Sequence, residues 1–253
     1  MRLVPEQTFS HYPAWPGPHG ISLPTLPAHP CPYLPERTAQ LRGGLVRSME
    51  GALYQDFMDA GCRRSGRFVY QPACPGSRAC VPVRVDVQRF APGKSHRRCM
   101  KRNADLRVRV DRPVLTDEKV ALYREYQRWR HDEPDARREQ LHEFLYDSPT
   151  ETMEFEYRDV SSTLLAVGIC DLTPLSLSSV YFFYAPVAKS RGIGIFGALT
   201  EIEHSRRSGR AFYYLGYWVE GCERMAYKVS FSGCDVLGTD GQWRSRDFGS
   251  GIC

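Results

Sequence analysis

The chain of 253 residues contains no long apolar run. No segment approaches the roughly 18 consecutive apolar residues that a membrane-spanning helix needs. Seven prolines crowd the first thirty residues, and this beginning lacks the apolar h-region of a signal peptide. We therefore expect a cytoplasmic protein that carries no membrane segment.

A disulfide framework is also not expected. The chain has nine cysteines, an odd number, and no secretion signal, so most of these thiols should be reduced. Cys170 lies in an apolar strand pattern and is expected to be a small core residue. No internal repeat or low-complexity segment is found. The 42% hydrophobic content can form a sizeable core, in one large domain or two small ones.

Acidic residues are scarce in one segment. Residues 63–112 hold fourteen Lys or Arg against three Asp, a net charge of +11, whereas residues 1–62 carry −1 and residues 113–253 carry −5. Such a block can attract an acidic peptide or an RNA backbone. A solvated surface would explain an arbitrary basic block equally well.

Hydrophobic spacing predicts several elements in the first half. Apolar residues recur at helical spacing between residues 49 and 57, and Gly61 stands where a helix C-cap is expected. Residues 81–87 alternate between Val and mostly polar residues, which predicts a strand with one buried face and Arg84 on the other. Residues 106–111 predict a second strand with a basic outer face.

Composition changes near Pro113, where we place a domain boundary between residues 1–113 and 114–253. Thr116 is predicted to N-cap a helix. Its inward side chains would be Val120, Tyr123 and Trp129. Further elements are predicted as a helix at 136–146, strands at 164–171 and 180–184, a helix at 195–207 closed by Gly209, and a strand at 212–218. We expect an α/β protein of α+β type.

Several ordered motifs cover nearly the whole chain. They are CPYLPER (31–37), RRSG (63–66), CPGSRAC (74–80), PVRVDVQRF (82–90), KSHRRCMKRNADL (94–106), YLGYWVEGCERMAYK (214–228) and DVLG (235–238). Together they resemble the bacterial aminoacyl-tRNA–protein transferases, specifically the leucyltransferases that modify N-terminal Asp or Glu. The strand–strand–helix–strand order of the second half is similar to the core of GNAT acyltransferases.

This resemblance implies a small N-terminal α+β domain for acceptor recognition and a GNAT-like C-terminal acyltransferase domain. The partners would be leucyl-tRNA and proteins that begin with Asp or Glu, whose products are marked for adaptor-assisted proteolysis in an N-degron pathway. No ATP or redox cofactor would be needed, because the aminoacyl group arrives already activated as its tRNA ester. The sequence does not indicate an oligomeric state.

An acceptor carboxylate suits a planar guanidinium, which can donate two parallel charge-assisted hydrogen bonds. The candidates come from RRSG and from the RRxxxRN pattern within KSHRRCMKRNADL. They are Arg63, Arg64, Ser65, Arg98, Arg102 and Asn103. Any single one of these cations could instead contact phosphate or be solvated.

The motif GYWVEG supplies the catalytic candidates at the end of a predicted strand. Glu220 could bind the acceptor's ammonium and accept its proton, directly or through water. Tyr217 could orient the ester or donate to the oxyanion, with Tyr214 as a less favoured substitute. A buried tyrosine with a satisfied hydroxyl is the competing interpretation for Tyr217.

KSRGIG, residues 189–194, is similar to the GNAT loop that binds the pyrophosphate of acyl-CoA. Glycines before a helix leave N–H groups free for an anion, here more plausibly a tRNA phosphate. The family pattern nearby is closer to S-L-G, so Arg191 departs from it. The predicted tRNA contacts are Lys94, Arg97, Arg191 and Lys228.

A metal site is not expected. Related eukaryotic arginyltransferases bind an iron–sulfur cluster through four cysteines, and many bacterial relatives have C-x-x-C-x-x-C at residues 74–80. Here Ser77 takes the middle position, and a hydroxyl is a poor substitute for a thiolate ligand. Cys31, Cys74 and Cys80 could still hold a metal with an outside ligand, and reduced thiols are the preferred interpretation.

Three alternative functions stay open. The donor could be arginyl-tRNA, because the aminoacyl pocket cannot be identified from sequence. KSRGIG and the element order would also fit a GNAT enzyme that uses acyl-CoA. The basic segment alone would fit a non-catalytic RNA-binding protein, although phosphate binding gives no reason for the carboxylate of Glu220.

Overall fold

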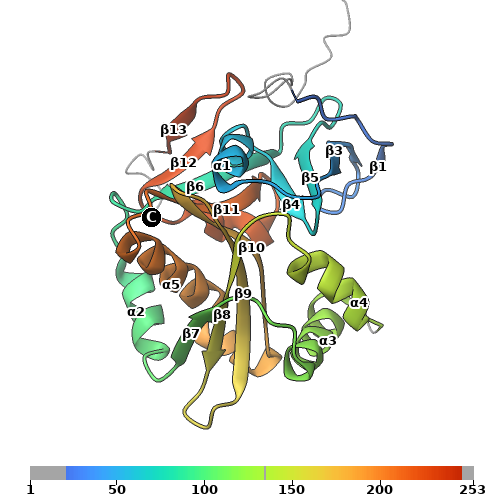
Figure 1. Cartoon of the computed structure of the whole chain (residues 1–253). Helices are drawn as coiled ribbons and strands as arrows, with labels where there is room; N and C mark the ends of the chain where they lie inside the picture. Colours follow the sequence, from blue (N-terminus) through green and yellow to red (C-terminus); the bar gives the residue numbers. More distant parts are fainter. Residues whose placement is uncertain (1–20, 134, 247–253) are drawn as a thin grey trace, which may run out of the picture.

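A computed structural model describes residues 21–133 and 135–246 of the chain. An eight-stranded sheet forms its centre, in the order β13-β12-β6-β11-β10-β9-β8-β7 (Figure 1). Its strands are β6 (Cys80–Asp86), β7 (Arg107–Asp111), β8 (Thr152–Arg158), β9 (Leu164–Leu172), β10 (Ser176–Tyr184), β11 (Phe212–Val219), β12 (Cys234–Leu237) and β13 (Trp243–Ser245). All neighbours in this sheet are antiparallel except β10 and β11.

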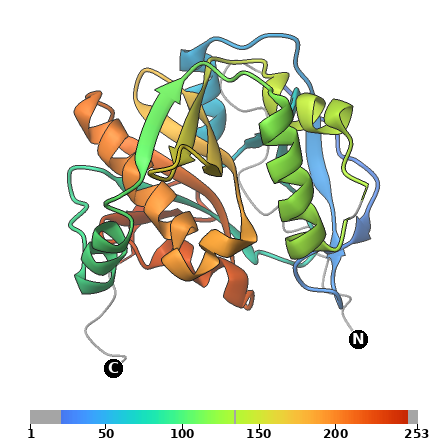
Figure 2. The same cartoon turned by 90° about the horizontal axis from the view of Figure 1, so that it is seen from below.

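Helices cover both faces of this sheet, as Figure 2 shows for the green and orange helices. One face carries α5 (Ile193–Arg207), against which α2 (Lys94–Arg102) packs. The other carries α3 (Asp117–His131) and α4 (Arg138–Leu141), which continues into the π-helical turn η2 (His142–Tyr146). Because both faces are covered, all nine residues of β9 are buried, which explains its mostly apolar sequence, interrupted by the one charged residue Asp171.

A second, three-stranded sheet lies at the upper right of Figure 1, beside the upper part of the large sheet. Its order is β3-β5-β4, with β3 (Leu41–Leu45), β4 (Arg63–Ser65) and β5 (Phe68–Pro72), and α1 (Gly51–Asp59) connects β3 to β4. The short strands β1 (His29–Pro30) and β2 (Thr38–Ala39) pair with each other. Tyr214 of β11 belongs to the apolar cluster of this unit, so the small sheet and the large one share core contacts.

The structure confirms the predicted strands and most of the helix signals. Thr116 caps α3 by accepting a hydrogen bond from the Lys119 N–H (3.4 Å), and Gly61 ends the α1 region with φ 85°. Cys170 is fully buried, as expected of a core thiol. The prediction that Trp129 faces inward is wrong, because this residue is 37% exposed at the last turn of α3.

The α/β character of the chain is confirmed by this mixture of helices and sheets. The boundary predicted after residue 113 lies beside the large sheet, since β6 and β7 precede it and β8 to β13 follow it. The division into two domains therefore stays a prediction. The Pro-rich start falls mainly in residues 1–20, outside the described residues. No helix in the described part of the chain is long and apolar enough to cross a membrane.

Candidate functional site

The two parallel strands of the large sheet separate soon after they meet. β10 and β11 pair only from Ser176 to Ser178 against Phe212 to Tyr214. The register of β10 then shifts after Ser179, and that of β11 shifts between Tyr214 and Gly216. Beyond these points the strands no longer supply hydrogen-bond partners to each other, so their facing backbone groups need partners from elsewhere. We call this opening the strand fork.

Arg63 of β4 occupies the base of the strand fork. Its Nη1 donates to Ser178 Oγ (2.7 Å), and its Nη2 donates to the Ser179 carbonyl, which the separation has freed. The guanidinium also lies 3.5 Å from where a Cβ on Gly216 would be, and Gly216 has φ 82°. A glycine at this position therefore allows both the turn in β11 and the close approach of the arginine.

Lys228 occupies the opposite side of the fork. It lies on η4 (Glu223–Val229), and its Nζ donates to the carbonyl of Tyr217 on β11 (2.9 Å). Burial lowers the pKa of the Lys228 ammonium to about 7, and the nearby guanidinium of Arg63 contributes in the same direction. The sequence predicted a phosphate contact for Lys228, and the structure places its ammonium at the fork, against the Tyr217 carbonyl.

Tyr217 and Glu220 lie on the β11 side but in different surroundings. The Tyr217 hydroxyl donates to the Gly61 carbonyl (2.8 Å), so it connects β11 to the end of α1. Glu220 lies in the exposed turn that follows β11, where its backbone N–H donates to Ala79 (3.0 Å). The carboxylate of Glu220 is accessible, whereas the Tyr217 hydroxyl is used in holding two elements together.

Arg64 points away from the fork, into the protein. Its guanidinium donates to both oxygens of Asp171 (2.7 and 2.6 Å), and both side chains are fully buried. Tyr54 and Thr152 donate their hydroxyls to the same carboxylate, each at 2.9 Å. This pairing gives Arg64 a structural role. Its neighbour Ser65 is half-buried in β4 and pairs with Phe68.

The RRxxxRN pattern and KSRGIG, predicted to serve different substrates, lie together. Asn103 donates from Nδ2 to the carbonyl of Arg191 (2.9 Å) and accepts from Arg191 Nε (3.1 Å). Arg102 donates to Ser190 (2.9 Å), and Arg191 forms an ion pair with Asp105. Asn103 is fully buried, so it connects the end of α2 to the loop before α5.

A basic surface results beside the N-terminus of α5. Its exposed or partly exposed members are Lys94, Arg97, Arg98, Lys101 and Arg102 of α2 and Lys189 and Arg191 of η3 (Pro186–Arg191). A Cβ placed on Gly194, in the first turn of α5, would meet no atom within 4 Å. This helix end is therefore open to an approaching anion, which its dipole and free N–H groups favour.

The three candidate metal ligands lie near one another without forming a ligand set. Burial, followed by the proximity of Cys74 and Cys31, raises the pKa of the Cys80 thiol to about 12. Cys74 Sγ accepts from the Gln40 N–H at 3.3 Å. Between residues 21 and 246, excluding residue 134, no three or more His, Cys, Asp or Glu side chains are arranged to hold a metal ion.

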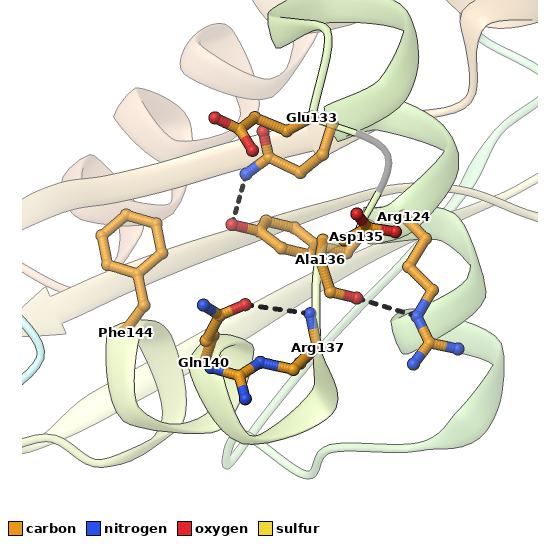
Figure 3. Close-up of a pocket in the computed structure, with 9 residues that line it drawn as sticks. Arg124, Glu133, Asp135, Ala136, Arg137, Gln140 and Phe144 are labelled. Atoms are coloured by element: carbon orange, nitrogen blue, oxygen red, sulfur yellow. Dashed lines mark hydrogen bonds between the residues drawn. The ribbon is translucent and has the colours of Figure 1, made fainter.

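A separate pocket of about 1050 Å³ lies between α3 and α4 (Figure 3). Arg124 donates to the Ala136 carbonyl (2.9 Å) and the Arg137 N–H donates to Gln140 (3.1 Å). Some polar groups that line the pocket are therefore hydrogen-bonded to one another. Phe144, on the α4 side, contacts Tyr181 of β10 with ring centroids 5.1 Å apart. Sequence reasoning did not identify this pocket, and none of the candidate site residues lines it.

Sequence reasoning also missed several residues around the fork. Tyr33, Tyr70 and Cys80 lie close enough for their charges to interact. The guanidinium of Arg63 partly offsets the rise in the pKa of Tyr70 that burial causes. Glu201 of α5 is 1% exposed, and burial raises its pKa to about 7. Tyr33 belongs to CPYLPER, so the motif was the available signal. Nothing in the sequence around Glu201 distinguishes it from a surface helix residue.

Comparison with known proteins agrees with the motifs. The arginine-tRNA-protein transferase N-terminus model matches residues 29–98, and the C-terminus model matches residues 118–238. An aspartate/glutamate leucyltransferase from Halorhodospira halophila is 39% identical, over 90% of this chain and 98% of its own length. One from Saccharophagus degradans is 34% identical, over 85% and 92%.

Solved structures are more distant. The C-terminal domain of a putative lysylphosphatidylglycerol synthetase from Agrobacterium fabrum is 15% identical with a TM-score of 0.46, covering 78% of this chain and 67% of that one. The sequence relatives are both closer and nearly equal in extent to this chain. The chain therefore belongs to the arginine-tRNA-protein transferase family, together with relatives named aspartate/glutamate leucyltransferase.

Proposed function

We propose that the protein transfers leucine from leucyl-tRNA to the N-terminal Asp or Glu of acceptor proteins. The acceptor's α-amine attacks the carbonyl carbon of the leucyl ester and forms a peptide bond. The ester C–O bond breaks, and the terminal ribose oxygen of the tRNA leaves and takes up a proton. The acceptor ammonium loses one proton before the attack and the new amide nitrogen loses another, so atoms and charge balance.

One observation supports this proposal more than any other. A fork with two cations at its freed carbonyls lies between the small sheet and η4, and a basic surface adjoins the N-terminus of α5. The first arrangement suits an acidic acceptor, and the second suits the phosphates of a tRNA acceptor end. A reaction that joins these two substrates would use both.

The donor would therefore dock on the α2, η3 and α5 surface. Arg97, Arg98, Lys94 and Lys189 offer charge to phosphates, while Asn103 and Arg102 fix the loop that presents Arg191. We assign Arg98 and Arg102 to this surface and not to the acceptor pocket. Lys228 is assigned to the fork and not to phosphate.

On the acceptor side, Glu220 remains the candidate base, because its carboxylate is accessible beside the end of β11. It would accept the ammonium proton directly or through water. Tyr217 acts as a positioning residue through its bond to Gly61. Holding both substrates in attack geometry would supply a large part of the acceleration, since positioning alone is worth about 7–11 kcal/mol in well-oriented reactions.

We further propose that the reaction takes place in the cytoplasm, needs no cofactor, and marks its products for proteolysis in an N-degron pathway. Support for the location comes from the charged tRNA that the reaction consumes, and support for the absence of a cofactor comes from the ester, which is already activated. Adding a chelator to the purified enzyme should leave the transfer rate unchanged.

The test is mass spectrometry of an Asp-initiated peptide after incubation with the protein and equal amounts of leucyl- and arginyl-tRNA. A leucine mass increment is expected. An arginine increment would favour the second candidate, an arginyl donor, which the name of the matched family model supports. Modification that requires acyl-CoA, or binding of tRNA with no modification, would refute aminoacyl transfer.

A further inference from the structure

Two cations, Arg63 and Lys228, lie at the strand fork. Arg63 donates to Ser178 and Ser179, and Lys228 donates to Tyr217. All of these acceptors are neutral. Among the described residues, neither cation forms an ion pair. Two like charges held close together and partly withdrawn from water repel each other, so this arrangement favours the binding of an anion.

The groups that face Lys228 do not offset its charge. They are Arg63 from β4, the Cys80 thiol from β6 and the Cys222 thiol from the turn after β11. The Cys80 thiol is neutral, because burial raises its pKa to about 12. Glu201 interacts with Ser179, Cys170 and Tyr213 instead, and burial raises its pKa to about 7, while Asp171 forms its ion pair with Arg64.

The fork is also accessible from outside. Lys228 and Tyr70 are partly exposed, and Tyr33, at 41% exposure, lies within electrostatic range of Tyr70, Cys80 and Cys222. Tyr70 of the small sheet and Tyr33, between β1 and β2, thus contribute aromatic side chains near the two cations. A short acidic side chain can approach the partly exposed Lys228, whereas a polyanionic RNA backbone would meet the exposed surface of α2 first.

We propose that Arg63 and Lys228 bind the side-chain carboxylate of the acceptor's first residue between them, and that Lys228 is thereby a specificity-determining residue. This inference rests on the proposed function and assigns a part of its acceptor site. The carboxylate binds to Lys228 in its protonated form.

Protonation of Lys228 makes acceptor binding depend on pH. In the free enzyme Lys228 has a pKa of about 7, so its protonated fraction falls about tenfold between pH 6 and pH 8. The acceptor's side chain is ionised across this range. Carboxylate binding raises the pKa of Lys228, so acceptor binding at pH 8 takes up a proton. The kcat/KM for an Asp-initiated peptide should follow this fraction.

The experiment compares the wild type with Lys228→Arg, using one Asp-initiated peptide and saturating leucyl-tRNA from pH 6 to pH 8. The titration of the peptide's own amine is the same for both enzymes, so it cancels in their ratio. Wild-type kcat/KM relative to that of Lys228→Arg should fall about tenfold over this range. Lys228→Met should raise KM for the peptide at pH 6 at least tenfold.

Arg207→Met serves as the control for loss of a cation, because Arg207 is exposed at the end of α5 opposite Gly192. It should keep the wild-type KM and pH profile. If Lys228→Met has a lower Tm than the wild type, its KM is set aside. The pH dependence of kcat/KM in Lys228→Arg, relative to the wild type, then decides whether Lys228 binds the carboxylate. A pH-independent ratio between wild type and Lys228→Arg, or a wild-type KM in a stably folded Lys228→Met, would overturn the carboxylate site. Absence of leucine transfer by the wild type would instead overturn the proposed function.

Discussion

Replacing Asp171 by Asn should destabilise the fold strongly without touching the acceptor site. The carboxylate accepts two bonds from Arg64 and one each from Tyr54 and Thr152, and the Arg64 and Asp171 side chains are fully buried. Asn keeps the size of the side chain but leaves the guanidinium charged and uncompensated. Breaking a buried pair in this way costs about 3–5 kcal/mol.

A loss of that size is a large part of the roughly 5–15 kcal/mol that stabilises a typical protein. For a chain of this length it corresponds to about 6–20 °C in Tm. Urea unfolding followed by circular dichroism measures it directly. The double variant Arg64→Met with Asp171→Leu should recover much of the loss, because it removes both charges and retains apolar volume.

The same variants test the reassignment of Arg64. If Arg64 is structural, folded Arg64→Met/Asp171→Leu protein should keep the wild-type KM for an Asp-initiated peptide. The reasoning is refuted if Arg64→Met leaves the unfolding free energy unchanged and raises that KM, since the guanidinium would then face the acceptor. Lys119, Glu154 and Glu156 form another buried ionic group, so Glu154→Gln offers a comparison for the cost of a broken pair elsewhere.

Three further predictions concern the candidate base, the donor surface and the buried acid of α5. Glu220→Gln should lower leucine transfer about a hundredfold or more while tRNA affinity, measured by filter binding, stays at the wild-type value. Arg97→Ala with Arg98→Ala should weaken binding of charged and uncharged tRNA alike and reduce the slope of log affinity against log salt by about 2, whereas Arg207→Ala should not. Burial raises the pKa of Glu201 in the folded state from 4.5 to about 7, so the protonated side chain stabilises the fold. The free energy of unfolding of the wild type, compared with that of Glu201→Gln, should therefore fall by about 3 kcal/mol as pH rises from 4.5 to 7. Urea unfolding measures this difference, with Glu203→Gln as the control.

Local patterns predicted the elements well because each pattern reflects one buried face. The alternation at residues 81–87 gave β6, whose Val83 and Val85 are fully buried, as is Val87 directly after it, and Arg84 faces the other side as expected. There Arg84 forms an ion pair with Asp59 (2.8 Å) and lies over the Phe212 ring. The helix α2 was missed, since its nine residues bury only His96 and Cys99 and show little apolar spacing.

The candidate site was predicted in its parts but not in its grouping. RRxxxRN and KSRGIG were assigned to different substrates, although Asn103 and Arg191 bind each other. Lys228 was separated from Arg63 because 164 positions lie between them in the numbering, and only the separation of β10 from β11 brings them to one opening. Contacts of this kind depend on strand order and register, which no local pattern specifies.

The pair Arg63 and Arg64 shows why a motif can mark a site without identifying the working residue. Both belong to RRSG, and successive side chains of a strand point to opposite faces. Because β4 pairs with β5 and places Arg63 opposite Tyr70, the side chain of Arg64 points toward the interior, where it binds Asp171. Only one guanidinium of the two can reach the fork. Arg64 holds β4 against β9 and so fixes the strand that carries Arg63. The site therefore needs one arginine of the motif, and the fold needs the other.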